Sequence, residues 1–216
     1  MPKRRFVLPA IVIALAGCAS GQGRTPVSSA PTAAAQTVSA QALYESGRDD
    51  ELVNRIAAAG GAAAPSDIWF AAQSKLRLGR RAEALDDLTR LSETSADPGV
   101  QAAVRLAVAR LNNDPGALDR ARGDAAAFAD NVFVQYELGL SYAAQNDFAS
   151  AARAFDRCIE IAPTFAYAYY QAALAYDRLN RMDLMANRFD RFVRLAPNAP
   201  ERPQVDSVLR TVGGRP

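Results

Sequence analysis

The chain has 216 residues, of which 50% are hydrophobic but only 8% aromatic, and its formal net charge is +2. A chain of this length can form one sizeable hydrophobic core. It contains no histidine and only two cysteines, Cys18 and Cys158. Without histidine it lacks the commonest acid–base side chain, and two distant cysteines form neither a CxxC metal site nor a disulfide framework. The composition therefore disfavours most classes of enzyme.

Residues 1–17 are typical of a secretory signal peptide. Three basic residues at positions 3–5 precede an apolar run, 6–16, that is shorter than the roughly 20 residues a membrane-spanning helix needs. The run ends in Leu15-Ala16-Gly17-Cys18. This motif resembles the bacterial lipobox, in which the cysteine thiol takes a lipid before cleavage. The resemblance implies lipidation at Cys18.

An ordinary signal peptide, cleaved after Ala14-Leu15-Ala16, is the alternative. Removal of residues 1–17 takes away three positive charges and leaves the rest of the chain near −1, which does not indicate a nucleic-acid-binding face. By the sorting rule for lipoproteins of bacteria with two membranes, Ala19 and Ser20 imply the outer membrane. The prediction is a protein anchored by its lipid in the cell envelope, facing the periplasm.

Residues 18–40 comprise the acylated cysteine and a polar, proline-containing stretch without an apolar face, which predicts a flexible linker. From about residue 41 onward, apolar residues recur at three- and four-residue spacing and turn signals follow every 12 to 16 residues. This pattern predicts an all-α fold of antiparallel helix pairs joined by tight connections. The turn signals include Gly47-Arg48, Leu78-Gly79, Asn112-Asn113, Gln145-Asn146 and Leu179-Asn180.

Residues 132–165 and 166–199 are similar when shifted by 34 positions. The first copy reads Leu138-Gly139-x-x-Tyr142, then Ala151-x-x-x-Phe155, then Pro163, and the second places Tyr176, Phe189 and Pro197 at the matching sites. This pattern resembles the tetratricopeptide-repeat (TPR) family. The resemblance implies a right-handed α-solenoid in which a small residue lets two helices approach and aromatic rings fill the seam between them.

The repeat length persists upstream although the motif fades. Residues 65–97 and 98–131 resemble degenerate copies, and residues 41–59 resemble a truncated leading pair. The predicted organisation is therefore TPR-like helix pairs over 41–131, two clear repeats over 132–199, and a capping helix with a tail over 200–216.

In the TPR family the first helix of each repeat lines a concave groove. Clustered aromatic rings on such a surface indicate a binding hot spot for a peptide or helix. The alternative is that the chain's own N-terminal part, or a neighbouring repeat, covers these rings. By repeat register, the predicted partner-binding residues are Phe133, Tyr136, Leu140, Tyr167, Tyr170, Leu174 and Asp177.

Other reactive side chains have structural interpretations. Cys158 is predicted to be a small buried hydrophobe rather than a redox thiol. Asp49-Asp50-Glu51 is predicted to start a helix, and Asp86-Asp87 to lie on an outer helix face. No catalytic residue, metal, cofactor, nucleic acid or small-molecule substrate is predicted. A face laced with ion pairs is predicted around Arg178, Arg181, Arg188, Arg191 and Arg194.

The sequence thus predicts a non-enzymatic, membrane-anchored scaffold or assembly factor that binds a partner protein in the bacterial cell envelope. One alternative is a pilotin-like assembly lipoprotein of a type IV or Flp/Tad pilus or secretion system. Others are a regulatory subunit of an envelope enzyme, which needs a convergent acidic cleft, and a purely structural subunit whose groove is already filled. The scaffold hypothesis predicts that changing Tyr136 and Tyr170 to alanine removes partner binding and leaves the fold intact.

Overall fold

The computed structural model describes residues 38–213, and these residues form α-helices, two short 3₁₀-helices and no strand. The all-helical prediction is confirmed. The predicted signal peptide, Cys18 and nearly all of the predicted linker lie outside the described residues. The helices are α1 (Ala40–Glu45), α2 (Asp49–Ala59), α3 (Pro65–Arg77), α4 (Arg81–Thr94), α5 (Pro98–Leu111), α6 (Pro115–Ala125), α7 (Val132–Ala144), α8 (Phe148–Ile161), α9 (Ala166–Arg178), α10 (Met182–Leu195) and α11 (Arg202–Gly213).

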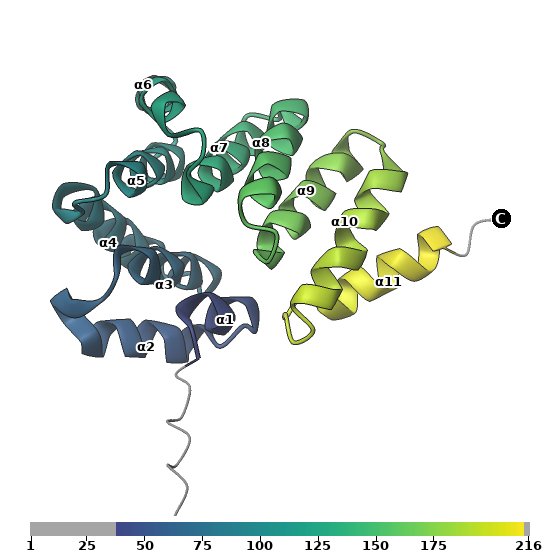
Figure 1. The fold of residues 1–216 in the computed structure, drawn as a ribbon, viewed down its shortest axis with the longest axis horizontal. Coiled ribbons are helices and arrows are strands. Elements are labelled where there is room, and N and C mark those ends of the chain that lie inside the picture. Colours follow the sequence, from purple (N-terminus) through teal and green to yellow (C-terminus); the bar gives the residue numbers. More distant parts are fainter. Residues whose placement is uncertain (1–37, 214–216) are drawn as a thin grey trace, which may run out of the picture. The chain divides into compact units, whose positions relative to one another are not determined.

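The helices form consecutive pairs, from α1/α2 to α9/α10, with α11 packed against α10 (Figure 1). Each second helix except α6 also packs extensively on the first helix of the next pair, so that the pairs stack into a TPR-like solenoid. Helix α6 packs chiefly on α5, and α5 packs directly against α7. None of the described helices is both long and apolar enough to span a membrane.

The turn between the two helices of a pair is the same in all five pairs. Each contains one residue in the left-handed backbone region, with φ between 52° and 77°, where glycine and asparagine are the favoured residues. The N–H of the following residue donates to a carbonyl five positions earlier, as from Asp147 to Tyr142 (3.0 Å). These five residues recur every 32 to 34 positions, which confirms the predicted turns: Gly47, Gly79, Asn113, Asn146 and Asn180.

The two helices of the first clear repeat come very close at Gly139. A β-carbon built on this residue would lie 2.6 Å from Phe155 Cδ1, which is closer than real side chains approach. Phe155 on α8 is fully buried and fills the space beside Gly139. The predicted role of a small residue at position 139 is therefore confirmed.

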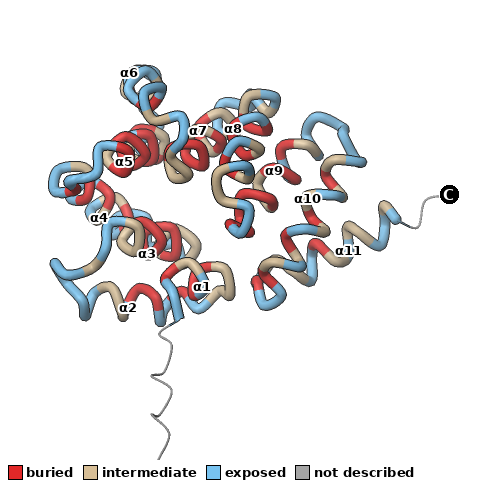
Figure 2. Tube along the Cα trace, in the orientation of Figure 1, coloured by how far each residue is buried: buried red, intermediate tan, exposed pale blue. Residues whose placement is uncertain are grey.

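Buried residues occur on every helix from α1 to α11 (Figure 2). The main core cluster extends along the solenoid from Leu43 in α1 to Val205 in α11, and a smaller cluster lies between α5, α6 and α7. At the C-terminal end, α11 buries Val205 and leaves its polar side exposed, as a capping helix does.

Candidate functional site

The seven predicted groove residues lie on α7 and α9, the first helices of the two clear repeats, but their exposure differs. Tyr136 and Tyr167 are buried, at 1% and 3% exposure. Phe133, Leu140 and Tyr170 are half-buried, whereas Leu174 is 39% exposed and Asp177 is also exposed. The prediction that these rings face solvent is therefore wrong for Tyr136 and Tyr167.

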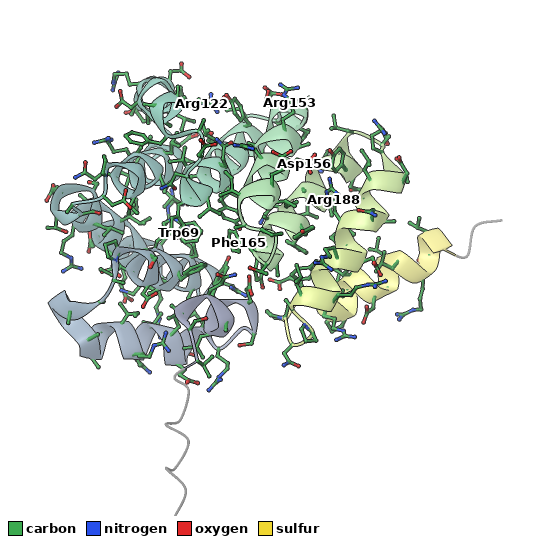
Figure 3. The ribbon with its side chains drawn as sticks, in the orientation of Figure 1. Trp69, Arg122, Arg153, Asp156, Phe165 and Arg188 are labelled. Carbon is green, nitrogen blue, oxygen red and sulfur yellow. The ribbon has the colours of Figure 1, made fainter. Side chains whose placement is uncertain are left out.

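The chain's own α3 covers the rings of α7. The indole of Trp69 lies 5.0 Å from the Phe133 ring and 5.5 Å from the Tyr136 ring, measured between ring centroids. Trp69 and Phe70 also contact Phe165, which directly precedes α9, at 6.3 Å and 5.9 Å; Figure 3 labels Trp69 and Phe165. Edge-on and tilted ring contacts at these distances are favourable.

Helix α1 covers the start of α9 in the same way. The rings of Tyr44 and Tyr167 lie 4.7 Å apart, and Tyr44 also contacts Phe70 at 5.7 Å. The alternative that the chain's own N-terminal part covers the predicted groove is thus what the structure shows for these rings. We call this set the aromatic interior: Tyr44, Trp69, Phe70, Phe133, Tyr136, Phe165 and Tyr167.

A buried carboxylate lies beside the aromatic interior. Glu137 on α7 is completely buried and accepts hydrogen bonds from Trp69 Nε1 (3.1 Å) and Gln73 Nε2 (2.9 Å). Its other oxygen pairs with Arg110 Nη2 on α5 at 2.8 Å. This network joins α3, α5 and α7, and the sequence pattern did not indicate it because its partners are 27 to 68 residues apart.

Burial keeps the tyrosines of the aromatic interior protonated. Loss of water contact raises the pKa of Tyr44 to about 12 and raises the pKa of Tyr136 and Tyr167 well above the ordinary value. These phenols are therefore neutral packing groups at physiological pH, and the Tyr167 hydroxyl donates a hydrogen bond to Glu201 Oε2 at 2.6 Å.

Four of the seven predicted groove residues on α7 and α9 keep contact with solvent and lie outside the aromatic interior. Leu140 and Leu174 occupy equivalent positions, 34 residues apart, and Tyr170 is one turn before Leu174. Asp177 adds a charge at the end of this surface. We call this set the exposed strip: Leu140, Tyr170, Leu174 and Asp177.

The remaining reactive side chains have the structural roles predicted for them. Cys158 is fully buried, which raises the pKa of its thiol to about 12, and its Sγ lies 3.6 Å from the Val132 carbonyl oxygen. Asp49 is in the first turn of α2, where it accepts a hydrogen bond from Ser74 Oγ at 2.6 Å. Within residues 38–213, no cluster of three or more acidic or cysteine side chains could hold a metal ion.

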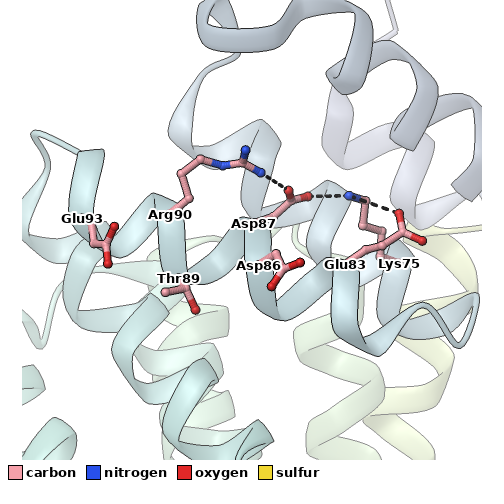
Figure 4. A pocket seen from close by; sticks show the side chains of 7 residues that line it. All are labelled: Lys75, Glu83, Asp86, Asp87, Thr89, Arg90 and Glu93. Carbon is pink, nitrogen blue, oxygen red and sulfur yellow. Dashed lines mark hydrogen bonds and ion pairs between the residues drawn. The ribbon is translucent and has the colours of Figure 1, made fainter.

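Asp86 and Asp87, which were predicted to lie on an outer helix face, line a shallow surface depression of about 440 Å³ (Figure 4). Asp87 pairs with Lys75 Nζ at 2.7 Å and with Arg90 Nη2 at 2.6 Å. Its charge is therefore already compensated, as on a solvated helix face. Three of the five predicted arginines of the last repeat also form ion pairs: Arg188 with Asp156 at 2.9 Å (Figure 3), Arg194 with Asp190 at 3.0 Å and Arg181 with Asp183 at 3.4 Å.

Comparisons with known proteins identify two repeats in the C-terminal half of the chain. Residues 132–165 and 167–199 each match a family model described as tetratricopeptide repeat. No curated protein sequence matches this chain.

Two kinds of solved structure are similar to the described fold. TTC0263, a thermophilic TPR protein in Thermus thermophilus, is 18% identical, with 79% of this chain and 95% of that chain covered and a TM-score of 0.54. MamA AMB-1 is 15% identical, with 77% and 92% covered and a TM-score of 0.42. The likeness to TTC0263 concerns the fold alone, and it extends beyond the two matched repeats to most of the chain.

Proposed function

We propose that this chain, whose helices α7–α10 form two tetratricopeptide repeats, is a non-enzymatic scaffold that binds a partner protein through the exposed strip. The observation that carries the proposal is the solvent-exposed Leu174 on the first helix of a matched repeat, one turn after the half-buried Tyr170 and at the position equivalent to the half-buried Leu140 of α7. An exposed apolar side chain one turn from a partly buried ring can be covered by a partner with little loss of side-chain freedom.

Ring packing restricts the side chains at the strip and next to it. Tyr136, one turn before Leu140, is packed against Phe155 at 5.8 Å, and Tyr170 packs against Phe192 at 5.0 Å. These contacts fix the side-chain positions of the strip before a partner arrives. Of the seven predicted groove residues, we therefore assign direct contact to the exposed strip and a supporting role to Phe133, Tyr136 and Tyr167.

The proposal includes a lipid anchor at Cys18. It rests on the sequence Leu15-Ala16-Gly17-Cys18 after a basic and an apolar segment. The lipid would hold the scaffold at a membrane of the bacterial envelope, with Ala19 and Ser20 favouring the outer membrane and a periplasmic location. Assembly of a type IV or Flp/Tad pilus or of a secretion system is one process that such an anchored scaffold would serve.

A regulatory subunit of an envelope enzyme is less well supported. That function needs unpaired carboxylates converging in a cleft, whereas Asp49 and Asp87, the two acidic candidates with buried or half-buried side chains, are both engaged by cations or hydroxyls.

Site-specific photocrosslinking tests the exposed strip. A photoreactive amino acid at Leu174 should yield a crosslinked partner protein in the cells that make the chain, and Leu174→Asp should reduce recovery of that partner at least about tenfold. The matched control is Leu78, which is 37% exposed but belongs to the α3–α4 turn and not to the strip. Equal crosslinking at both positions, or none at Leu174, would rule out the strip as the binding surface.

The anchor is tested separately. Cells supplied with a labelled fatty acid should incorporate the label into the chain, and the protein should sediment with membranes. Cys18→Ser should remove both properties, whereas Cys158→Ser should retain them because Cys158 is buried in the fold. Label retained by Cys18→Ser would contradict lipidation at this cysteine.

A further inference from the structure

The two ends of the solenoid meet. Glu45 Oε1 at the end of α1 accepts a hydrogen bond from the backbone N–H of Ala166 at 2.8 Å, across 121 residues of chain. The turn at Gly47 is so close to Pro200 that a β-carbon on Gly47 would lie 2.9 Å from the proline Cδ. Stacking of neighbouring helix pairs does not by itself produce such contacts between the first pair and the last.

Arg77, the last residue of α3, lies at the centre of this junction. Its guanidinium carbon is 4.2 Å from the Tyr44 ring centroid and 4.9 Å from the Tyr167 ring centroid, so that the cation is held against two aromatic faces. Nη1 donates to Tyr167 Oη at 2.7 Å and Nη2 to the Tyr44 carbonyl oxygen at 3.1 Å.

Carboxylates from both ends complete the surroundings of this cation. Asp49 Oδ2 on α2 lies 3.3 Å from Arg77 Nε, and Glu201 Oε1, between α10 and α11, lies 3.9 Å from Nη1. The Tyr167 hydroxyl donates to Glu201 Oε2 at 2.6 Å, so that one connected network links α1, α2, α3, α9 and the start of the C-terminal cap.

The geometry suits a contact that can open and close. Ring stacking and charge-assisted hydrogen bonds to Arg77 are made by side chains, and the Arg77 side chain keeps 21% of its surface and Glu201 keeps 22% in contact with solvent. A charged group at the solvent boundary can exchange its partners for water or for another ion without first unfolding a helix.

We propose that Arg77 is a latch that holds the first two helix pairs against the last repeat, and that its release lets the ends separate and uncovers the aromatic faces of Tyr44 and Tyr167. In the latched state these faces are unavailable to a partner, so that the latch controls access to them. The residues that the latch covers, Tyr44 and Tyr167, are not members of the exposed strip, although Tyr167 contacts Tyr170 of the strip at 5.9 Å. The latch does not depend on partner binding at the strip.

The test is a distance measurement by pulsed electron paramagnetic resonance. Spin labels are placed on the full chain at Asn54→Cys in α2 and Ser207→Cys in α11, both exposed positions, with Cys18→Ser and the buried Cys158 left in place. The parent chain should give one distance population. Arg77→Ala should add a population at longer distance, and the Ala166 amide should exchange its hydrogen at least about tenfold faster because its acceptor on Glu45 moves away.

Two controls show whether loss of the Arg77 guanidinium causes the longer-distance population. Arg80→Ala removes the same charge from an exposed arginine, whose ion pair within residues 38–213 is with Asp50 at the start of α2 (3.2 Å), and should leave the distances unchanged. Millimolar guanidinium ion should occupy the site emptied by Arg77→Ala and return the distances to those of the parent chain. A parent-like distance distribution in a fully helical Arg77→Ala chain would overturn the proposal.

If Arg77→Ala does not fold, a second variant, Glu201→Ala, tests the latch. Glu201→Ala removes one end of the latch from a segment outside the helices and leaves the aromatic contacts of α3 in place. A longer-distance population in this variant supports the latch. An unchanged distribution shows that the ends are held by the hydrophobic interior alone and refutes it.

Discussion

Gly139 shows how one residue sets the distance between two helices. Replacing it by alanine would place a methyl group 2.6 Å from Phe155 Cδ1, inside a filled core. Overpacking of this kind costs about 1–3 kcal/mol, so we expect Gly139→Ala to lower the free energy of unfolding by that amount in urea titrations. Gly123 in α6 is the matched control because a β-carbon there meets no atom within 4 Å.

Gly123→Ala should instead stabilise the protein by roughly 0.5–1 kcal/mol, since alanine is the better helix former. The same substitution, glycine to alanine, would then change the free energy of unfolding in opposite directions in α7 and α6. A stabilising Gly139→Ala would mean that α7 and α8 separate more easily than their packing indicates.

Glu45 gives the fold a pH dependence of known sign. Burial raises the pKa of its carboxyl above its ordinary value, and the hydrogen bonds from Gln41 and Ala166 only partly oppose this effect. Because the folded state holds this proton more tightly, the group stabilises the fold fully below the unfolded pKa, and that contribution is lost as pH rises through the folded pKa.

Glu45→Gln remains uncharged and keeps an acceptor for the Ala166 N–H. We therefore expect it to raise the free energy of unfolding relative to the parent chain at pH 7, with a difference that shrinks as pH falls toward 4. Thermal denaturation across this range measures the effect, and Glu93→Gln, at an exposed position, serves as the control. An equal difference at every pH would show that the Glu45 proton is not linked to folding.

At the scale of elements, the turns within the five helix pairs could be predicted from the sequence because of their backbone conformation. A helix pair needs a residue that adopts positive φ, and glycine and asparagine do so most easily, so the five turns are visible in the sequence even where the core pattern has faded. The degenerate pairs could be located by length and turn residues. The direct packing of α5 on α7 could not, because small alanines in this region carry no distinctive signature.

The turn at Asn146 is testable in the same terms. Asn146→Ala forces a residue with a β-carbon into φ of 62° and should lower the free energy of unfolding by about 1–2 kcal/mol. Asn146→Gly should be close to neutral because glycine adopts this conformation without steric cost. Urea titration of the two variants measures the difference, and equal stabilities would mean that the turn changes shape to suit the side chain.

At the scale of the whole molecule, the sequence indicated which aromatic residues matter but not which residues pack against them. Repeat register predicted that Tyr136 and Tyr167 line the concave groove, where an open solenoid would expose them. Trp69 and Tyr44 pack there instead, and contacts between residues so far apart leave no periodic trace in one sequence. Only Leu174 and Asp177 are exposed as predicted.

Because Tyr136 is buried under Trp69, the expected effect of Tyr136→Ala on stability changes. The sequence predicted that this substitution leaves the fold intact. Tyr136→Ala should now lower the free energy of unfolding by about 3–5 kcal/mol, since it empties a fully buried site. Leu174→Ala, at an exposed site, should change it by less than about 0.5 kcal/mol. Chemical denaturation compares the two, and a Tyr136→Ala chain as stable as its parent would show that the interior can open at little cost.

Repeat arrays are commonly shortened, extended or spliced, because each unit touches only its neighbours and the ends fray independently. Here the first helix hydrogen-bonds to the last repeat, and a tryptophan of the second pair reaches residues of the fourth and fifth. Removing either terminus would therefore deprive the opposite one of its packing. The polypeptide should melt in a single cooperative transition, and neither half should serve as a transplantable cassette.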